Sequence, residues 1–339
     1  MSDNTDSSAG TPRTERSTAG NLALGAFGGG DIVGGEMLGK ALQQEHRPAV
    51  APQNKQSFGR WFVDKGWRHL VAWAAIVFAL FPLMYILSAS FNPIGTLTGS
   101  NQLFSAFSLR NYEKLFTDPA IPYATWYVNS LVIATVVSVA TVFLCALGAY
   151  AFSRMRFRGR RVGLVSLLVV QMFPQLLAIT AIFLLMIQIS DVFPAIGLGT
   201  HAGLIMIYLG GALGVNIFLM YGFFNTIPPA LDEAAKIDGA GHARVFFTIM
   251  LPLVTPILVV VGLLVFIGTI GEFAIASVIL TDPTTQTVAI GLFQLVSGFQ
   301  SQNWGVFSAG ALLAALPVML IFFVSQKYIA GGLVSGSVK

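Results

Sequence analysis

The chain of 339 residues has few charged side chains and a single cysteine. Charged residues make up 10% of the sequence, whereas a soluble domain usually carries about 25%. These charges are too few to cover a water-exposed globular surface, so the composition excludes an ordinary soluble enzyme. Because Cys145 is the only cysteine, an internal disulfide framework and a cysteine-based zinc site are excluded as well.

The sequence also lacks the residue patterns that are typical of catalysis and of metal binding. Its four histidines are scattered without metal-ligand spacing. No Ser/His/Asp arrangement falls on one side of a membrane, and no apolar run contains paired carboxylates. The stretch 34–41 resembles a phosphate-binding loop, but Ala41 stands where that loop needs a hydroxyl to bind Mg²⁺. We therefore predict no catalytic residues, no metal site and no cofactor.

Apolar residues dominate instead, at 55% of the chain with a mean hydropathy of +0.74. A helix needs about 20 apolar residues to cross the hydrocarbon core of a bilayer, and windows of that size occur six times. Helices are expected because backbone amides find no water partner in lipid. The sequence predicts an all-α membrane protein with six transmembrane helices, at residues 69–90, 127–152, 162–186, 202–224, 253–280 and 305–326.

Composition also predicts how the chain is organised around these spans. Residues 1–59 are polar and Gly-rich, which is typical of a disordered tail. Residues 91–126 form a loop between the first two spans, residues 127–328 form the membrane core, and residues 329–339 form a C-terminal tail.

Lysine and arginine predict the orientation of the spans. Twelve of these residues flank the spans on the side that holds both termini, whereas the opposite side has only Arg110 and Lys114. Because cytoplasmic loops carry the excess of positive charge, both termini and both tails are predicted to be cytoplasmic, and the loop 91–126 extracytoplasmic. The arginine cluster at 153–161 fits this rule and is compatible with contact to lipid headgroups. It gives no reason to expect nucleic-acid binding.

The cytoplasmic loop at 226–252 is long for a simple connection. It reads as two short helices, with Thr226 as a possible N-cap and Gly239 as a left-handed C-cap. The second helical piece runs from His242 to about Met250. Small alanine side chains on one side of the first helix allow close approach, and we interpret the loop as a docking site for a cytoplasmic partner.

The motif in this loop resembles the EAA loop of binding-protein-dependent ABC importer permeases. The resemblance rests on the spacing of Glu233, Ala234, Ala235, Gly239, Ile249, Leu251 and Pro252. It implies the type I ABC importer permease fold and makes the first loop helix a coupling helix that sits on an ATPase subunit. It further implies a multi-pass protein of the cytoplasmic membrane of a bacterium or archaeon. The implied partners are a second permease, two ATPase subunits and an extracytoplasmic sugar-binding protein.

Further similarity runs over about 70–339 and is strongest in the C-terminal third, for example at 276–280 and 332–339. This third resembles the smaller permease subunit of maltose transporters, which implies maltose or maltodextrin as the substrate. Trehalose or another oligosaccharide is the alternative. From other classes, an ion-coupled secondary carrier would need more intramembrane acids, and a scaffold without transport would leave the polar span residues unexplained.

Three polar residues inside the spans are candidates for the translocation path. Glu272 is the one charge well inside a span, and burying it in the bilayer costs on the order of 3 kcal/mol, so it should face protein or a water-filled cavity. Gln171 and Gln175 are four residues apart and would share one helix face. Either role remains open for all three: lining the path or joining helices by hydrogen bonds.

An extracytoplasmic loop before the last span combines amides with aromatic rings, which suit sugar hydroxyls and sugar faces. In the resembled family the corresponding loop enters the cleft of the binding protein. An interfacial aromatic belt is the alternative. The candidate residues are Phe299, Gln300, Gln302, Asn303 and Trp304.

Overall fold

The computed structural model describes residues 62–94, 103–297 and 303–335. Within these ranges all regular secondary structure is helical, as predicted. The predictions for residues 1–59 and for Phe299, Gln300 and Gln302 lie outside them. The chain divides into two units, Met1–Val71 and Ala72–Lys339. The described part of the first unit consists of the π-helical turn η2 (Phe62–Gly66) and the first residues of α3.

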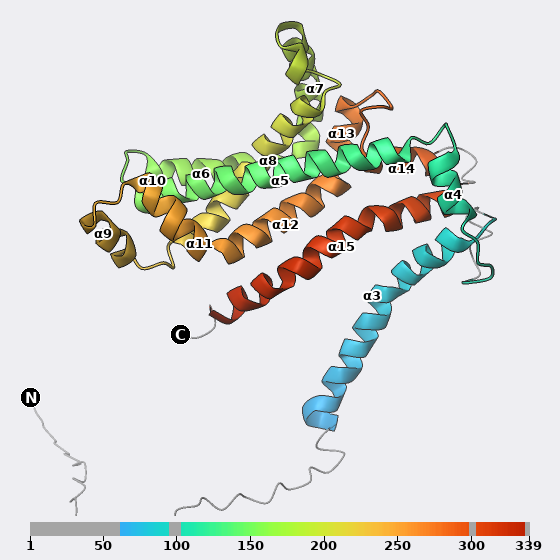
Figure 1. Ribbon diagram of the computed structural model, residues 1–339, viewed down its shortest axis with the longest axis horizontal. Coiled ribbons are helices and arrows are strands. Elements are labelled where there is room, and N and C mark those ends of the chain that lie inside the picture. Colours follow the sequence, from blue (N-terminus) through green and yellow to red (C-terminus); the bar gives the residue numbers. More distant parts are fainter. Residues whose placement is uncertain (1–61, 95–102, 298–302, 336–339) are drawn as a thin grey trace, which may run out of the picture. The chain divides into compact units, whose positions relative to one another are not determined.

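Four predicted spans are continuous helices, as Figure 1 shows for the second unit. They are α3 (Trp67–Phe91), α5 (Tyr123–Arg154), α8 (His201–Phe224) and α15 (Trp304–Ser335). Each is apolar along its length and long enough to cross a bilayer. The last of them continues to Ser335, so the predicted tail begins as helix.

The third predicted span, 162–186, is wrong as a single helix. The chain forms α6 (Arg160–Gln171) and then α7 (Gln175–Val192), separated by a short break. Pro174 stands at the N-cap of α7, where it has no N–H to donate and where it disfavours helical backbone in the residue before it. Of the two helices, α7 has the length and composition of a membrane span.

The fifth predicted span, 253–280, is broken as well. It consists of α12 (Thr255–Gly271) and α13 (Ala274–Ile279), with Glu272 in an extended conformation between them. The described residues include five helices that could each cross a membrane. A sixth candidate is the pair His242–Leu253 and Thr255–Gly271, which is bent by 77°.

Helix α5 lies at the centre of the second unit. It packs along α8 and α12, and α12 packs in turn against α15 (Figure 1). Small buried side chains let these helices approach closely, and Ala146 and Ala149 of α5 are almost fully covered. The resulting core continues beyond α5, α8 and α12 into the loop at 226–252.

The segment 91–126 contains a short helix, α4 (Arg110–Thr117), that anchors the end of α3. The amide of Asn111 donates hydrogen bonds to the carbonyl oxygens of Ser90 at 2.9 Å and Asn92 at 2.8 Å. At this end of the unit, α14 (Val288–Val296) packs beside α5 and α15. These contacts bring α4, α14 and the first turns of α5 and α15 together around one apolar cluster.

Candidate functional site

The loop at 226–252 folds into two short helical pieces, as its sequence predicts. The first is α9 (Ala230–Ile237), and the second combines α10 (His242–Val245) with the π-helical η5 (Phe246–Met250). A single turn, α11 (Leu251–Leu253), then leads into α12.

The two ends of α9 are formed differently from each other. Gly239 has a φ of +78°, and its N–H donates to the carbonyl of Lys236 while that of Ala240 donates to Ala235. This is a Schellman cap, which confirms the predicted left-handed glycine. The prediction of Thr226 as N-cap is wrong, because its hydroxyl donates back to the carbonyl of Phe223 and Pro229 occupies the cap position.

Helix α9 has one buried face and one exposed face. Asp232 and Ala235 are buried against the rest of the unit. Glu233 and Ala234 are exposed, and so is Ile237, whose exposed fraction is 87%. The alanines therefore do not share one docking surface as the sequence suggests: Ala234 is available to a partner, whereas Ala235 packs in the core.

The later residues of the EAA-like motif attach the loop to the helix core. Ile249 and Leu251 are partly buried and pack on the core around α5, α8 and α12. Pro252 is exposed within α11. The part of the motif between Gly239 and Pro252 thus anchors α9 to the helix core. The exposed residues of α9 form the surface that is available to a partner.

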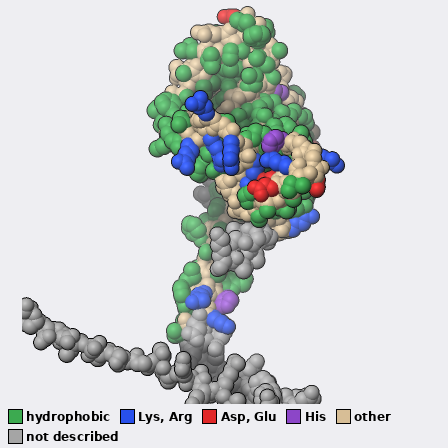
Figure 2. Space-filling model, turned by 90° about the vertical axis from the view of Figure 1, so that its left-hand side faces the viewer, with side chains coloured by type: hydrophobic (Ala, Val, Ile, Leu, Met, Phe, Trp, Pro, Cys, Tyr) green, Lys and Arg blue, Asp and Glu red, His purple; other side chains and the backbone are tan. Residues whose placement is uncertain are grey.

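Two contacts that the sequence analysis missed join this loop to the last turns of α5. Arg154 forms a buried ion pair with Asp232, at 2.5 Å between Nε and Oδ2. The hydroxyl of Tyr150 lies 3.2 Å from Nδ1 of His242. Charge next to an apolar run was the available signal for Arg154, but the sequence does not indicate which acid it meets. Figure 2 looks onto this end of the molecule, where basic, acidic and histidine side chains gather.

Glu272 lies at the break between α12 and α13 and bonds to protein groups on two elements. Its carboxylate accepts hydrogen bonds from the backbone N–H groups of Ile275 at 2.8 Å and Ala276 at 3.0 Å, and from the hydroxyl of Tyr208 at 2.5 Å. The carboxylate therefore caps α13 and joins it to α8. It also lines a cavity of about 210 Å³ together with Gln175 and Thr269.

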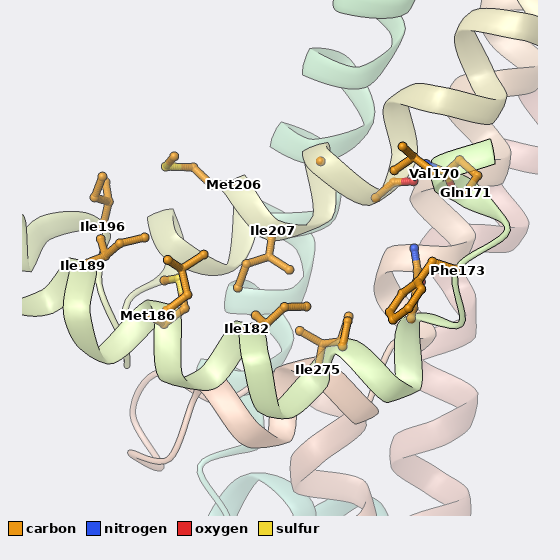
Figure 3. Close-up of a pocket in the computed structure, with 15 residues that line it drawn as sticks. Val170, Gln171, Phe173, Ile182, Met186, Ile189, Ile196, Met206, Ile207 and Ile275 are labelled. Atoms are coloured by element: carbon orange, nitrogen blue, oxygen red, sulfur yellow. Dashed lines mark hydrogen bonds between the residues drawn. The ribbon is translucent and has the colours of Figure 1, made fainter. Parts of the chain in front are cut away.

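The helix break separates the two glutamines that were expected on one helix face. Gln171 ends α6, and its amide donates to the carbonyl of Gly211 on α8 at 2.6 Å, so it joins helices. Gln175 begins α7 and is exposed. Both still line one mostly apolar cavity of about 600 Å³, across which Ile182 and Ile207 face each other in Figure 3.

Of the candidate loop before α15, the structure describes Asn303 and Trp304. The side-chain amide oxygen of Asn303 accepts a hydrogen bond from Lys114 of α4 at 3.1 Å. The Trp304 ring packs edge-on against Phe307, with centroids 5.4 Å apart. The end of this loop is thus tied to α4.

Comparison with known proteins identifies the family. Residues 143–334 match the family model described as "Binding-protein-dependent transport system inner membrane component". The maltose/maltodextrin permease MalG of Vibrio vulnificus is 38% identical over 281 residues, covering 80% of this chain and 94% of that protein. The galactooligosaccharide permease GanQ of Bacillus subtilis is also 38% identical, covering 80% and 93%.

A solved structure shows the same fold. A bacterial ABC transporter involved in the import of the polysaccharide alginate matches 80% of this chain and 98% of its own, with a TM-score of 0.64 and 24% identity. A second alginate transporter structure, in complex with a periplasmic protein, gives a TM-score of 0.56 at 15% identity over 79% of this chain and 93% of that one.

The fold, the apolar helices and the relatives all indicate a membrane-spanning transport component. The protein is a non-enzymatic, multi-pass component of the cytoplasmic membrane. The chain therefore belongs to the family of binding-protein-dependent ABC importer permeases, and within it resembles the maltose and maltodextrin permeases.

Proposed function

We propose that this chain is the permease subunit of an ATP-driven importer that carries maltose or maltodextrin into the cytoplasm. The observation that carries the proposal is the shape of the EAA-like loop. Its base is fixed in the helix core, while α9 presents Glu233, Ala234 and Ile237 on its exposed face. A short helix whose last residue, Ile237, is an exposed apolar side chain suits docking into a cleft of an ATPase.

The orientation predicted from positive charge places this loop in the cytoplasm, where ATP is available. Closure of the ATPase on its nucleotide would displace α9 and move the membrane helices between inward-facing and outward-facing states as rigid bodies. Because the family to which the chain belongs consists of transport components, the work would come from this partner.

The exposed surface of α3 supports a second permease as a partner. In the most apolar window of this helix no residue is buried, and Phe78 has an exposed fraction of 84%. Lipid covers part of such a helix, and a homologous permease would cover the rest and complete the pore.

The sugar path would run past the polar cluster around Glu272. Gln175 and Thr269 share its cavity. Gln175 offers an amide to sugar hydroxyls, and Thr269 offers its hydroxyl oxygen as an acceptor, because that hydroxyl already donates to the carbonyl of Val265 at 2.8 Å. Gln171 takes a packing role instead, because its amide already bonds to Gly211. On the extracytoplasmic side, Asn303 and Trp304 mark the end of the loop proposed to meet a sugar-binding protein.

Maltose is favoured because several relatives named for it share 35–38% identity over most of the chain. The galactooligosaccharide permease GanQ and the first of these maltose permeases are equally similar to this chain, at 38% identity. Another oligosaccharide, trehalose included, is therefore the second candidate. Family membership argues against an ion-coupled carrier. Much of the sugar contact would lie in the second permease.

Two measurements test the proposal. Purification in mild detergent should recover an ATPase and a second permease with this chain, and proteoliposomes of that complex should take up labelled maltose only with ATP and a binding protein. Replacing Glu233 with lysine should release the ATPase while the permease stays inserted. A matched control is Glu113→Lys, since Glu113 is an exposed first-turn acid of α4, which like α9 has eight residues. An ATPase that stays bound in both variants would refute coupling through α9.

A further inference from the structure

A buried ion pair joins the proposed coupling helix to the central membrane helix. Arg154 is the last residue of α5, and Asp232 lies in the first turn of α9. Only 9% and 7% of their side chains are exposed, and the guanidinium also donates to the carbonyl of Ile227 at 2.7 Å. The pair thus holds α9 from the side opposite its exposed face.

Stability alone does not explain this pair. Removing two charges from water costs several kcal/mol per ion, and an apolar pair of similar size often stabilises a protein equally well. In some proteins a buried ion pair fixes how two elements are placed against each other, which an apolar pair does not do. Here those elements are α9, which would receive force from an ATPase, and α5, which forms the centre of the bundle.

Other contacts fix the same end of α5 to the loop on either side of α9. The Tyr150 ring packs on Phe246 of η5 with centroids 5.2 Å apart, and its hydroxyl lies against His242. Before α9, the hydroxyl of Ser153 donates to the amide oxygen of Asn225 at 2.8 Å. Helix α9 itself contributes Ala235 to the apolar core shared with α5, and its charged link to α5 is the ion pair.

The opposite end of α5 holds the segment between α13 and α14. The indole of Trp126 donates to the carbonyl of Pro283 at 3.1 Å, and the amide of Asn129 donates to those of Thr284 and Gln286. With 32 residues, α5 is about 48 Å long at 1.5 Å per residue. It therefore connects the coupling loop directly to the far end of the bundle.

We propose that Arg154 and Asp232 form the link that passes displacement of α9 into α5, so that both act as positioning residues for transport. This inference rests on the proposed coupling of α9 to an ATPase. It assigns the transmission step to one ion pair. It predicts that a permease without this pair still binds the ATPase, but that more ATP is hydrolysed for each sugar molecule transported.

The test replaces the pair by apolar residues of similar size, Arg154→Met with Asp232→Leu, which leaves no unpaired buried charge. The matched control, Arg158→Met with Asp191→Leu, removes the same two charges from exposed positions. The measurement is labelled maltose taken up per ATP hydrolysed by the purified complex in proteoliposomes. In the apolar variant this ratio should fall roughly tenfold, the size of a typical coupling between two sites, while the ATPase stays bound. The control should keep the wild-type ratio.

A merely structural pair gives the opposite result, because the apolar replacement would then restore both assembly and the wild-type ratio. That outcome would overturn the inference. If the apolar variant yields no complex, the charge exchange Arg154→Asp with Asp232→Arg decides. A ratio higher than that of Asp232→Arg alone supports a link through charge, and an equal ratio overturns it.

The failure of the proposed function is distinguishable from the failure of this inference. An ATPase that stays bound to the Glu233→Lys variant refutes docking on α9. An ATPase that leaves that variant, together with a wild-type transport ratio in the Arg154 and Asp232 variant, refutes the link alone.

Discussion

Replacing Gly239 with alanine tests whether the left-handed backbone conformation at this position stabilises the C-terminal cap of α9. Steric crowding by a side chain does not interfere with this test. Nothing lies within 4 Å of the position that a Cβ atom would take there, so the substitution meets no steric obstacle. The φ of +78° is the only obstacle, and a left-handed conformation costs an L-residue about 1–2 kcal/mol. A cost of that size reduces the population of the capped loop by a factor of about 5–30.

Gly241 provides the matched control. It is also exposed and has no neighbour within 4 Å of its Cβ position, but its φ is −72°. Alanine restricts the unfolded chain, which favours folding by about 0.4–1 kcal/mol, but Gly241 is the N-cap of α10, where alanine is disfavoured relative to glycine. Because these two effects oppose each other, Gly241→Ala should change the loop much less than Gly239→Ala, although the two positions lie two residues apart.

The assay is hydrogen exchange of the loop, read by mass spectrometry on the detergent-purified protein. The amides of Gly239 and Ala240 are the informative ones, since they donate to Lys236 and Ala235 in the cap. Their exchange should become about 5–30 times faster in Gly239→Ala, in line with the cost above, and change much less in Gly241→Ala. Equal exchange in the two variants would show that the cap conformation does not control the loop.

Two further predictions concern the opposite end of the bundle. A Cβ at Gly291 would lie only 2.0 Å from the Trp126 ring, so Gly291→Ala should destabilise the protein by about 1–3 kcal/mol, measured as earlier loss of the monodisperse peak on heating. Hydrogen bonds from Thr284 lower the pKa of Asp282 below its usual value. Because the pKa is lowered on folding, this carboxylate stabilises the loop at neutral pH and loses that effect as the pH falls through the lowered pKa. Asp282→Asn should therefore reduce heat stability at pH 7 and make no difference in acid, and a constant difference at all pH values would contradict the assignment.

The sequence predicts the number and type of the long helices well, because an apolar run of sufficient length has few alternatives in a membrane. It fails where one run contains two helices. Pro174 gives a visible signal for the break between α6 and α7. The break at Glu272 has a weaker signal, because the carboxylate acts on the backbone N–H groups of residues further along the chain. A polar residue in an apolar run can therefore mark a helix end as well as a site.

The EAA-like loop illustrates the same division between local and distant information. Gly239 is predictable because left-handed backbone favours glycine at one position, whatever surrounds it. The burial of Ala235 and the pairing of Asp232 with Arg154 depend on how a loop packs against a helix 78 residues earlier. Spacing within the motif contains no information on that packing, and so the sequence places both alanines on one surface although the structure separates them.

Glu272 shows how the two readings of a membrane carboxylate can be distinguished. Its cost in the bilayer, on the order of 3 kcal/mol, is offset by three donors: the backbone N–H groups of Ile275 and Ala276 and the hydroxyl of Tyr208. Glu272→Gln keeps one acceptor oxygen and turns an NH₂ group toward at least one of these donors, at a cost of about 1–3 kcal/mol for the donor left unpaired. Tyr208→Phe removes the hydroxyl and leaves the cap on α13 in place.

If the carboxylate mainly joins helices, both variants should lose heat stability, and the KM of the complex for maltose, the proposed substrate, should stay unchanged. If it also lines the sugar path, Glu272→Gln should raise that KM at a temperature where both variants remain folded. The cavity shared with Gln175 leads us to expect the second result. An unchanged KM, together with equal losses of stability, would leave Glu272 as a helix cap and exclude it from the path.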